Sequence, residues 1–194
     1  MKRKTTMMIA LMALLIFAIP VYAGPPTDAA QKSVNDVLDV LRNTKLNANV
    51  KKDKLRTIYK DMFDEIEFSK RTLARNWNNF TPAQRTEFVK LFEEILEKSY
   101  ADKLLDYTNE KVAFYKEDMI TPTLAEVQSK IITSSKEIPI FYRMILKDGK
   151  WKVYDVVVEN VSLVQNYRTQ FNDILSKDSP DKLLETLRKK VSKH

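Results

Sequence analysis

The stretch that decides the fold is IPIFYRMILKDGKWKVYDVVV, residues 138–158. Runs of β-branched and aromatic residues flank Asp148-Gly149. An Asp-Gly pair between such runs predicts a two-residue hairpin, because a type I′ turn needs a positive φ at both central positions. The predicted register has these cross-strand pairs: Leu146 with Trp151, Met144 with Val153, Tyr142 with Asp155, and Ile140 with Val157. One side of the hairpin is then apolar except for Asp155, and we expect that side to face the interior.

The order of helical and extended patterns along the chain predicts the fold class. Apolar residues recur at helical spacing in four segments before the strands, near 28–41, 55–63, 66–77 and 81–107. The stretches KVAFYKE (111–117) and LAEVQSKIITSS (124–135) predict two strands before the hairpin. Further helices follow it, within 163–174 and 180–191. This order predicts an α+β fold, a single domain whose antiparallel sheet of about four strands packs against several helices.

Helix-capping residues mark several of these boundaries. Thr81 as N-cap, Pro82 at the first helical position and Gln84 three residues after the cap form a capping box. Ser162 and Gln165 form a second one before the helix of 163–174. Thr27 or Asp28 is placed to cap the first helix.

Residues 1–23 have the features of a cleaved secretory signal peptide. Basic residues 2–4 precede the uncharged run MMIALMALLIFAIP (7–20), and a small-residue cleavage site ends at Ala23. The run is short for a membrane span and ends in proline. We expect cleavage between Ala23 and Gly24, which leaves residues 24–194 as one exported domain. The alternative, a retained membrane helix, predicts full-length protein in membrane pellets.

The composition excludes several kinds of site. The chain has no cysteine, its two glycines are Gly24 and Gly149, and its one histidine is the terminal His194. Disulfides, zinc sites, His-based triads, cysteine nucleophiles and glycine-rich phosphate loops are therefore excluded. The formal net charge is +7, which falls by three when residues 2–4 leave. The remaining dispersed charge argues against nucleic-acid binding and fits transient contact with an anionic membrane surface.

Two stretches of the chain resemble a known family. VYDVVVENVSLVQNYRTQF (153–171) resembles the signature of the MlaC family, also called the toluene-tolerance auxiliary family. TLARNWNNFTPAQRTEFVKLFEEILEKSYADKL (72–104) is similar to its other recurrent stretch, a Leu-Gly-x-x-Trp element followed by a Gln-x-x-x-Phe helix. The resemblance extends over nearly the whole chain. Ala74 and Asn160 stand where the family usually has Gly, which affects the local backbone conformation.

The resemblance implies a periplasmic phospholipid carrier and not an enzyme. Sheet and helices would form an NTF2-like cone around a hydrophobic cavity that holds the acyl tails, with the headgroup near solvent. Such a cavity is expected near the upper end of the usual range of roughly 300–1,000 Å³. Phospholipid is the implied cargo, with no cofactor and no metal. The implied partners are an inner-membrane ABC transporter complex with MCE-type subunits and an outer-membrane lipoprotein complex, between which a monomer shuttles lipid.

Apolar residues on the inner sheet face and the neighbouring helices are the candidate pocket residues. They are Trp77, Phe88, Phe92, Ile95, Tyr107, Phe114, Ile140, Tyr142, Met144, Leu146, Trp151, Val153, Val157, Tyr167 and Phe171. From the residues alone these stripes have two interpretations, the wall of a lipid cavity or a close-packed core, and the core is the commoner case.

Polar residues of the signature are assigned structural roles: Asp155, Ser162, Asn166 and Arg168. An unpaired buried carboxylate is costly, so Asp155 needs a partner, for which Arg168 and Tyr142 are the candidates. Arg143 is expected on the opposite face of the hairpin, in solvent.

Two other functions stay open at this point. One is a periplasmic chaperone with an apolar groove for lipoproteins or polypeptides. The other is a carboxylate-based enzyme with Asp155 as its base.

Overall fold

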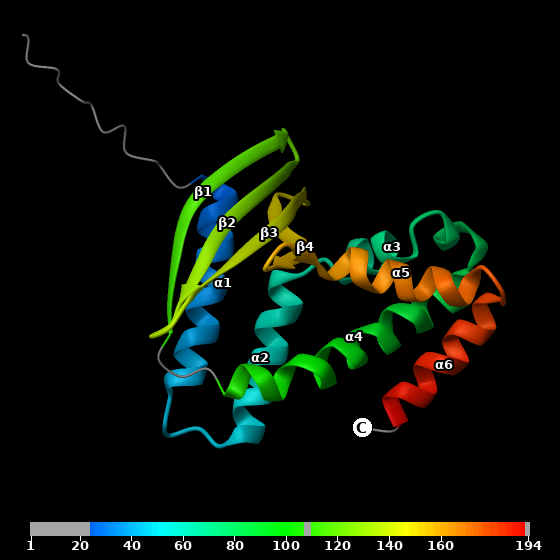
Figure 1. Cartoon of the computed structure of the whole chain (residues 1–194), viewed down its shortest axis with the longest axis horizontal. Coiled ribbons are helices and arrows are strands. Elements are labelled where there is room, and N and C mark those ends of the chain that lie inside the picture. The colour runs from blue at the N-terminus through cyan, green and yellow to red at the C-terminus, as the bar shows by residue number, and fades with distance from the viewer. Residues whose placement is uncertain (1–23, 107–109, 193–194) are drawn as a thin grey trace, which may run out of the picture.

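In the computed structural model, residues 24–106 and 110–192 are described. The expected leader (1–23) and Tyr107 lie outside these ranges. The elements follow the expected order of helices, strands and helices (Figure 1). They are α1 (Pro25–Arg42), α2 (Ala48–Met62), α3 (Glu65–Leu73), the 3₁₀ helix η1 (Ala74–Asn79), α4 (Pro82–Leu105), β1 (Lys111–Thr121), β2 (Leu124–Ile132), β3 (Glu137–Lys147), β4 (Lys150–Val158), β5 (Val161–Ser162), α5 (Leu163–Leu175) and α6 (Pro180–Ser192).

The strands form one antiparallel five-stranded sheet in the order β1-β2-β3-β4-β5, which confirms the predicted α+β class. The additional strand is the short β5, which pairs with the end of β4. Helix α1 packs against β1, β2 and β4, and α4, α5 and α6 lie together beside the sheet (Figure 1). None of the described helices is long and apolar enough to cross a membrane.

The β3–β4 hairpin turns at Asp148 and Gly149, whose φ values of 50° and 73° are both positive, as predicted. Near the turn the register is also as predicted, with Leu146 opposite Trp151 and Met144 opposite Val153. A β-bulge then advances β4 by one residue, so that Asp155 lies opposite Arg143. The predicted pairs Tyr142–Asp155 and Ile140–Val157 are therefore wrong, and Val156 and Val158 take those places. A bulge moves every following side chain relative to the partner strand, and alternation alone does not reveal one.

Helix boundaries agree with the predicted caps at α4 but not at α1. Thr81 and Gln84 form both hydrogen bonds of the predicted capping box. Helix α1 instead begins at Pro25 after Gly24, because proline fits the first helical turn, where backbone N–H groups have no partner in the helix. Thr27 lies inside this helix and bonds to Glu117 of β1. Thr27 and Asp28 are thus not its N-caps.

The buried side chains form two clusters. The helical cluster lies among α3, α4, α5 and α6 and is rich in phenylalanine, with Phe88, Phe92 and Phe171 in mutual contact. The sheet cluster includes Val127, Met144 and Val153 under helix α1. Phe63, the C-cap of α2, packs against both clusters and so marks the junction between them.

Candidate functional site

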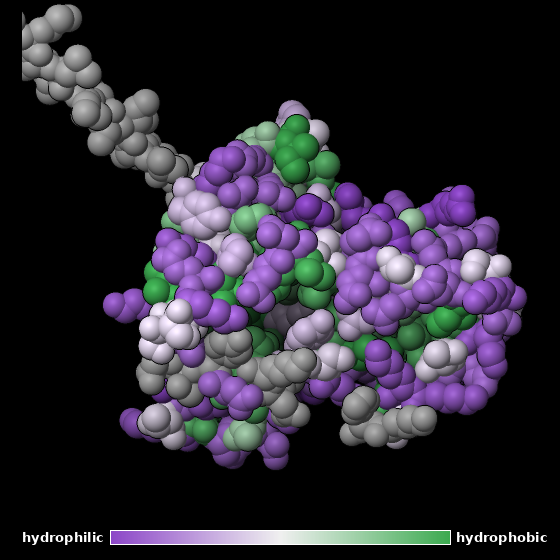
Figure 2. Space-filling view, viewed as in Figure 1, coloured by the Kyte–Doolittle hydropathy of each residue, from purple (hydrophilic) through white to green (hydrophobic). Residues whose placement is uncertain are grey.

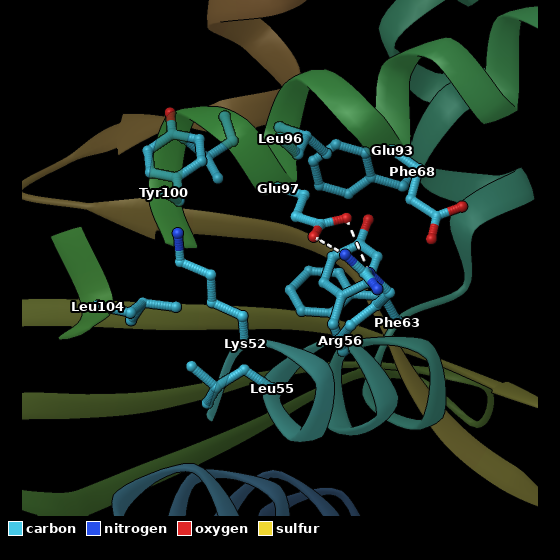
Figure 3. A pocket seen from close by; sticks show the side chains of 12 residues that line it. Lys52, Leu55, Arg56, Phe63, Phe68, Glu93, Leu96, Glu97, Tyr100 and Leu104 are labelled. Atoms are coloured by element: carbon cyan, nitrogen blue, oxygen red, sulfur yellow. Dashed lines mark hydrogen bonds and ion pairs between the residues drawn. The ribbon is translucent and has the colours of Figure 1, made fainter. Parts of the chain in front are cut away.

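A cavity of about 200 Å³ lies between helices α2 and α4 (Figure 3). Nearly all of its wall surface is apolar, although charged side chains stand at its rim. The lining residues are Lys52, Leu55, Arg56, Tyr59, Phe63, Phe68, Glu93, Leu96, Glu97, Tyr100, Leu104 and Leu163. Its volume is below the roughly 300–1,000 Å³ of typical ligand pockets, so this cavity is smaller than the one that the family resemblance implied.

The apolar walls follow from a spacing of four residues on both helices. Leu55, Tyr59 and Phe63 recur at this spacing along α2 and its C-cap, while Leu96, Tyr100 and Leu104 do so along α4. Residues four apart lie on one face of a helix, so each helix presents one apolar stripe. The rings of Tyr59 and Phe63 stack with centroids 4.6 Å apart. Burial and the nearby carboxylates of Glu65 and Glu93 raise the pKa of Tyr59, so this hydroxyl stays neutral at physiological pH.

Ion pairs join α2 to α4 along the rim of the cavity. Arg56 Nε donates to Glu97 Oε2 at 3.0 Å, and Arg56 Nη2 also contacts Glu97 Oε1 (Figure 3). Close to it, Lys60 Nζ lies 3.0 Å from Glu93 Oε1. These pairs are partly exposed, so each contributes little to stability. Helix α4 packs far more extensively on α6 than on α2. The contact between α2 and α4, formed by Arg56, Lys60, Glu93 and Glu97, is therefore weak and borders the apolar cavity. We call it the α2–α4 seam.

The surface view agrees with this arrangement. The face shown in Figure 2 is mostly hydrophilic, and hydrophobic side chains appear between hydrophilic ones near its middle.

A second hollow, of about 330 Å³, is polar and contains Asp155. Asp155 is 2% exposed and accepts hydrogen bonds from Arg143 Nη1 at 3.1 Å, Ser162 Oγ at 2.6 Å and the Val164 backbone N–H at 3.0 Å. The bulge in β4 produces this arrangement because it turns Asp155 toward Arg143. The predicted partners Arg168 and Tyr142 are therefore wrong. Arg143 is partly exposed, as predicted, but it also pairs with Asp155 and Glu126. The three donors connect the carboxylate to β3 and to the start of α5, an arrangement that suits a structural role.

The other signature residues have local contacts. Ser162 is the N-cap of α5 and accepts from the Gln165 N–H at 3.0 Å. Arg168 donates from Nε and Nη2 to the backbone carbonyl of Arg71 at 3.0 and 2.7 Å, which ties α5 to α3. Asn166 is exposed and accepts from Gln170 Nε2 at 3.3 Å.

None of the described pocket candidates lines the α2–α4 cavity. Members of the helical cluster, or packed against it, are Trp77, Phe88, Phe92, Ile95, Tyr167 and Phe171. Members of the sheet cluster, or packed against it, are Phe114, Ile140, Tyr142, Met144, Trp151 and Val153. Val157 is buried and Leu146 half-buried elsewhere, while Tyr107 lies outside the described residues. The apolar stripe of α4 is so wide that one edge faces α5 and α6 and the other faces α2. The spacing of apolar residues along α4 does not show which edge of this stripe packs against which helix.

The charged residues beside the cavity follow a pattern in the sequence that was not part of the predicted pocket. Arg56 and Lys60 are four residues apart on α2, and Glu93 and Glu97 are four apart on α4. Complementary charge pairs at this spacing, each beside an apolar stripe, indicate two helices that face one another.

Comparison with known proteins gives consistent matches. The family model "MlaC protein" matches residues 31–189. The intermembrane phospholipid transport system binding protein MlaC of Haemophilus influenzae is 27% identical over 173 residues, which cover 84% of this chain and 79% of the relative. The toluene tolerance protein ttg2D of Pseudomonas putida is 26% identical over 176 residues, covering 86% and 82%. The solved structure of the phospholipid-binding protein from Ralstonia solanacearum, in complex with a phospholipid, superposes with a TM-score of 0.80 at 22% identity, covering 88% of this chain and 98% of that one. That likeness shows that the two chains share a fold.

Proposed function

The chain belongs to the MlaC family, and from that premise we propose that it carries phospholipid, with the acyl tails entering between α2 and α4. The relatives named above are a phospholipid transport binding protein and a toluene tolerance protein, which supports this assignment. The observation that carries it is the apolar cavity with a weak, charged seam between the two helices.

Free-energy magnitudes explain why such a carrier needs a dry cavity. A diacyl lipid has on the order of thirty methylenes, so exposing both tails to water costs roughly 25 kcal/mol at about 0.8 kcal/mol per CH₂. A carrier has to offer an environment about as apolar as a bilayer, so that loading and unloading are nearly balanced. It does not have to bind more tightly than the membrane.

The proposed route for the tails runs between α2 and α4 into the interior. At about 200 Å³ the cavity holds only part of a lipid, so loading requires that α2 move away from α4. Phe63 lies at the inner end of this route, where the helical and sheet clusters meet. Movement of Phe63 would let a tail pass along the sheet face toward Tyr142, Met144 and Val153. In this way the sheet-face candidates predicted from the sequence become contacts of the deeper part of the tail.

The charged rim suits the headgroup. Lys52 and Arg56 are four residues apart on α2, so both cations stand on the side from which a lipid phosphate would approach. Glu93 and Glu97 face them from α4. The headgroup therefore stays at the surface while the tails are buried.

The cellular setting follows the same proposal. Cleavage of residues 1–23 would release the domain into the periplasm, where it would move phospholipid between an inner-membrane MCE-type ABC complex and an outer-membrane lipoprotein complex. We assign it binding and transport because the relatives named above are a phospholipid transport binding protein and a toluene tolerance protein. Asp155, the one carboxylate considered as a base, accepts three hydrogen bonds that connect it to β3 and to the start of α5.

Lipid analysis of the purified protein tests this function. We expect solvent extraction to yield phospholipid in stoichiometric amount, and the delipidated protein to take up lipid from phosphatidylethanolamine–phosphatidylglycerol vesicles. If no phospholipid co-purifies and none is loaded, the proposal is wrong. Binding of unfolded polypeptide without lipid would instead favour the chaperone with an apolar groove.

A further inference from the structure

Glu117 on the edge strand β1 lies against the first turn of α1. Its Oε2 accepts hydrogen bonds from the Thr27 backbone N–H at 2.9 Å and from Thr27 Oγ1 at 2.6 Å. Within the described ranges no Lys or Arg forms an ion pair with Glu117, and its neighbours Lys116 and Asp118 pair with each other at 2.7 Å. Glu117 is therefore a half-buried carboxylate whose donors are all neutral.

The same carboxylate crowds Gly24. A Cβ built on Gly24 would lie 2.1 Å from Glu117 Oε1 and 2.9 Å from Oε2, so the Glu117 side chain would have to move away. Because glycine has no Cβ, the Glu117 carboxylate can lie directly against this residue. The Gly24 nitrogen is bonded to the same Cα, so it too lies within a few ångströms of the carboxylate.

Gly24 is also the residue after the cleavage site predicted from the sequence. Hydrolysis of the Ala23–Gly24 peptide bond by a signal peptidase consumes one water. It leaves a carboxylate on Ala23 and an amino group on Gly24. An α-amino group has an ordinary pKa of about 7.7–8.0, so this group is mostly protonated at pH 7. Once the bond is broken, rotation about the Gly24 Cα–C bond carries the nitrogen toward the position next to Oε1.

We propose that Gly24 is the first residue of the mature protein and that Glu117 binds its ammonium group. The positive end of the α1 dipole disfavours an ammonium at this place, and the Glu117 carboxylate compensates for it. Asp28, in the first turn of α1, adds a second negative charge nearby. The uncleaved chain has a neutral amide at Gly24 and cannot form this ion pair. Processing therefore fastens α1, which covers the sheet cluster, to the edge of the sheet.

The test uses the mature protein exported from cells, whose first residue is identified by mass spectrometry. The α-amino pKa is then measured from the pH dependence of its reaction with an amine-labelling reagent, in wild type, Glu117→Gln and Asp118→Asn. The last is a matched control, since Asp118 is the next residue on β1 and pairs with Lys116. We expect an α-amino pKa above the ordinary 7.7–8.0 in wild type and Asp118→Asn, and a pKa within or below that range in Glu117→Gln, where the helix dipole is no longer compensated.

Chemical acetylation of the amino group gives a second readout without a mutation. Acetylated wild type should melt about 1–3 °C lower than unmodified protein at pH 7, because an exposed ion pair is lost. Acetylation of Glu117→Gln should not lower the melting temperature, because the ammonium there has no carboxylate partner and lies at the positive end of the α1 dipole. A first residue other than Gly24, an ordinary α-amino pKa in wild type, or equal acetylation effects in the two proteins would each overturn the proposal.

Discussion

Arg56 on α2 and Glu97 on α4 form a two-point ion pair across the mouth of the apolar cavity. Lys60 and Glu93 repeat the connection close by, at 3.0 Å. These contacts hold the two helices together at the seam where we propose that the acyl tails enter. The α2–α4 seam has ion pairs on its outside and apolar side chains inside. The two helices therefore close over the cavity, and separating them costs little free energy.

Removal of the first ion pair should accelerate loading. Glu97→Gln loses an exposed pair that contributes roughly 0–1 kcal/mol, so uptake of a fluorescent phospholipid from vesicles should become up to about fivefold faster. Asp36→Asn is the control, because it removes the exposed Lys32–Asp36 pair on α1, away from the cavity. Salt screens such pairs, so ionic strength should speed the wild type more than the variant. Unchanged uptake in Glu97→Gln would show that lipid enters elsewhere.

Replacement of Ala74 by glycine should stabilise the fold. Its backbone has φ 48° and ψ −125°, a region that only glycine adopts without strain. Ala74→Gly should therefore raise the free energy of unfolding by about 1 kcal/mol in urea denaturation. Ala83→Gly in α4 is the matched control and should lower it by up to about 1 kcal/mol, since glycine is a poor helix former. A loss of stability in Ala74→Gly would contradict the assigned backbone conformation.

Asp155 should matter for stability and not for chemistry. In wild type, one oxygen of Asp155 accepts hydrogen bonds from Arg143 and Ser162. In Asp155→Asn an amide NH₂ can take the place of that oxygen and faces these donors as another donor. Arg143 also loses its buried counter-charge. We expect a loss of about 2–4 kcal/mol in the free energy of unfolding. Ser162→Ala should cost about 1 kcal/mol as a lost helix cap. Below the melting temperature, lipid uptake by Asp155→Asn should equal that of wild type, and its abolition would point to a direct role.

The Asp64–Lys147 pair makes part of the stability depend on pH. Burial alone would raise the pKa of Asp64, but the Lys147 ammonium at 2.8 Å and the backbone N–H of Glu67 outweigh it and hold the pKa below its ordinary value. Because the folded-state pKa is depressed, the stabilisation is fully present above the ordinary value near 3.9. It is lost as the pH falls through the folded-state pKa.

Asp64→Asn isolates this charge, because asparagine also serves as an N-cap for α3. Since Lys147 is half exposed, we expect the variant to be less stable by about 0.5–1 kcal/mol at pH 7. The difference should shrink as the pH is lowered below about 4 and vanish when both proteins are neutral at this site. Urea denaturation at a series of pH values measures it, and a pH-independent difference would exclude the ion pair as its cause.

The fold class could be predicted from the sequence because short sequence motifs determine where helices begin and where strands turn. The Asp148-Gly149 turn and the Thr81–Gln84 capping box each depend on a few neighbouring residues. The bulge in β4 was not predictable, since nothing local distinguishes Tyr154 as an extra residue in the strand. That single insertion decided the partners of Asp155.

The site was harder to predict than the fold for a related reason. Apolar periodicity identifies which side of α4 is buried, but Phe92 and Leu96 on that side have different neighbours. The first packs among phenylalanines of the helical cluster, while the second also borders the cavity. Whether an apolar side chain fills space or borders it depends on how helices from distant parts of the sequence approach one another.

The central claim is that the space between α2 and α4 takes up phospholipid, and native mass spectrometry of the purified protein tests it most directly. Leu55→Trp adds bulk to the cavity wall, whereas Val50→Trp adds the same bulk at an exposed position of α2 that does not line the cavity. We predict that wild type and Val50→Trp carry the added mass of a phospholipid and that folded Leu55→Trp carries little or none. Lipid-free wild type, or equal lipid occupancy in all three proteins, would contradict the account.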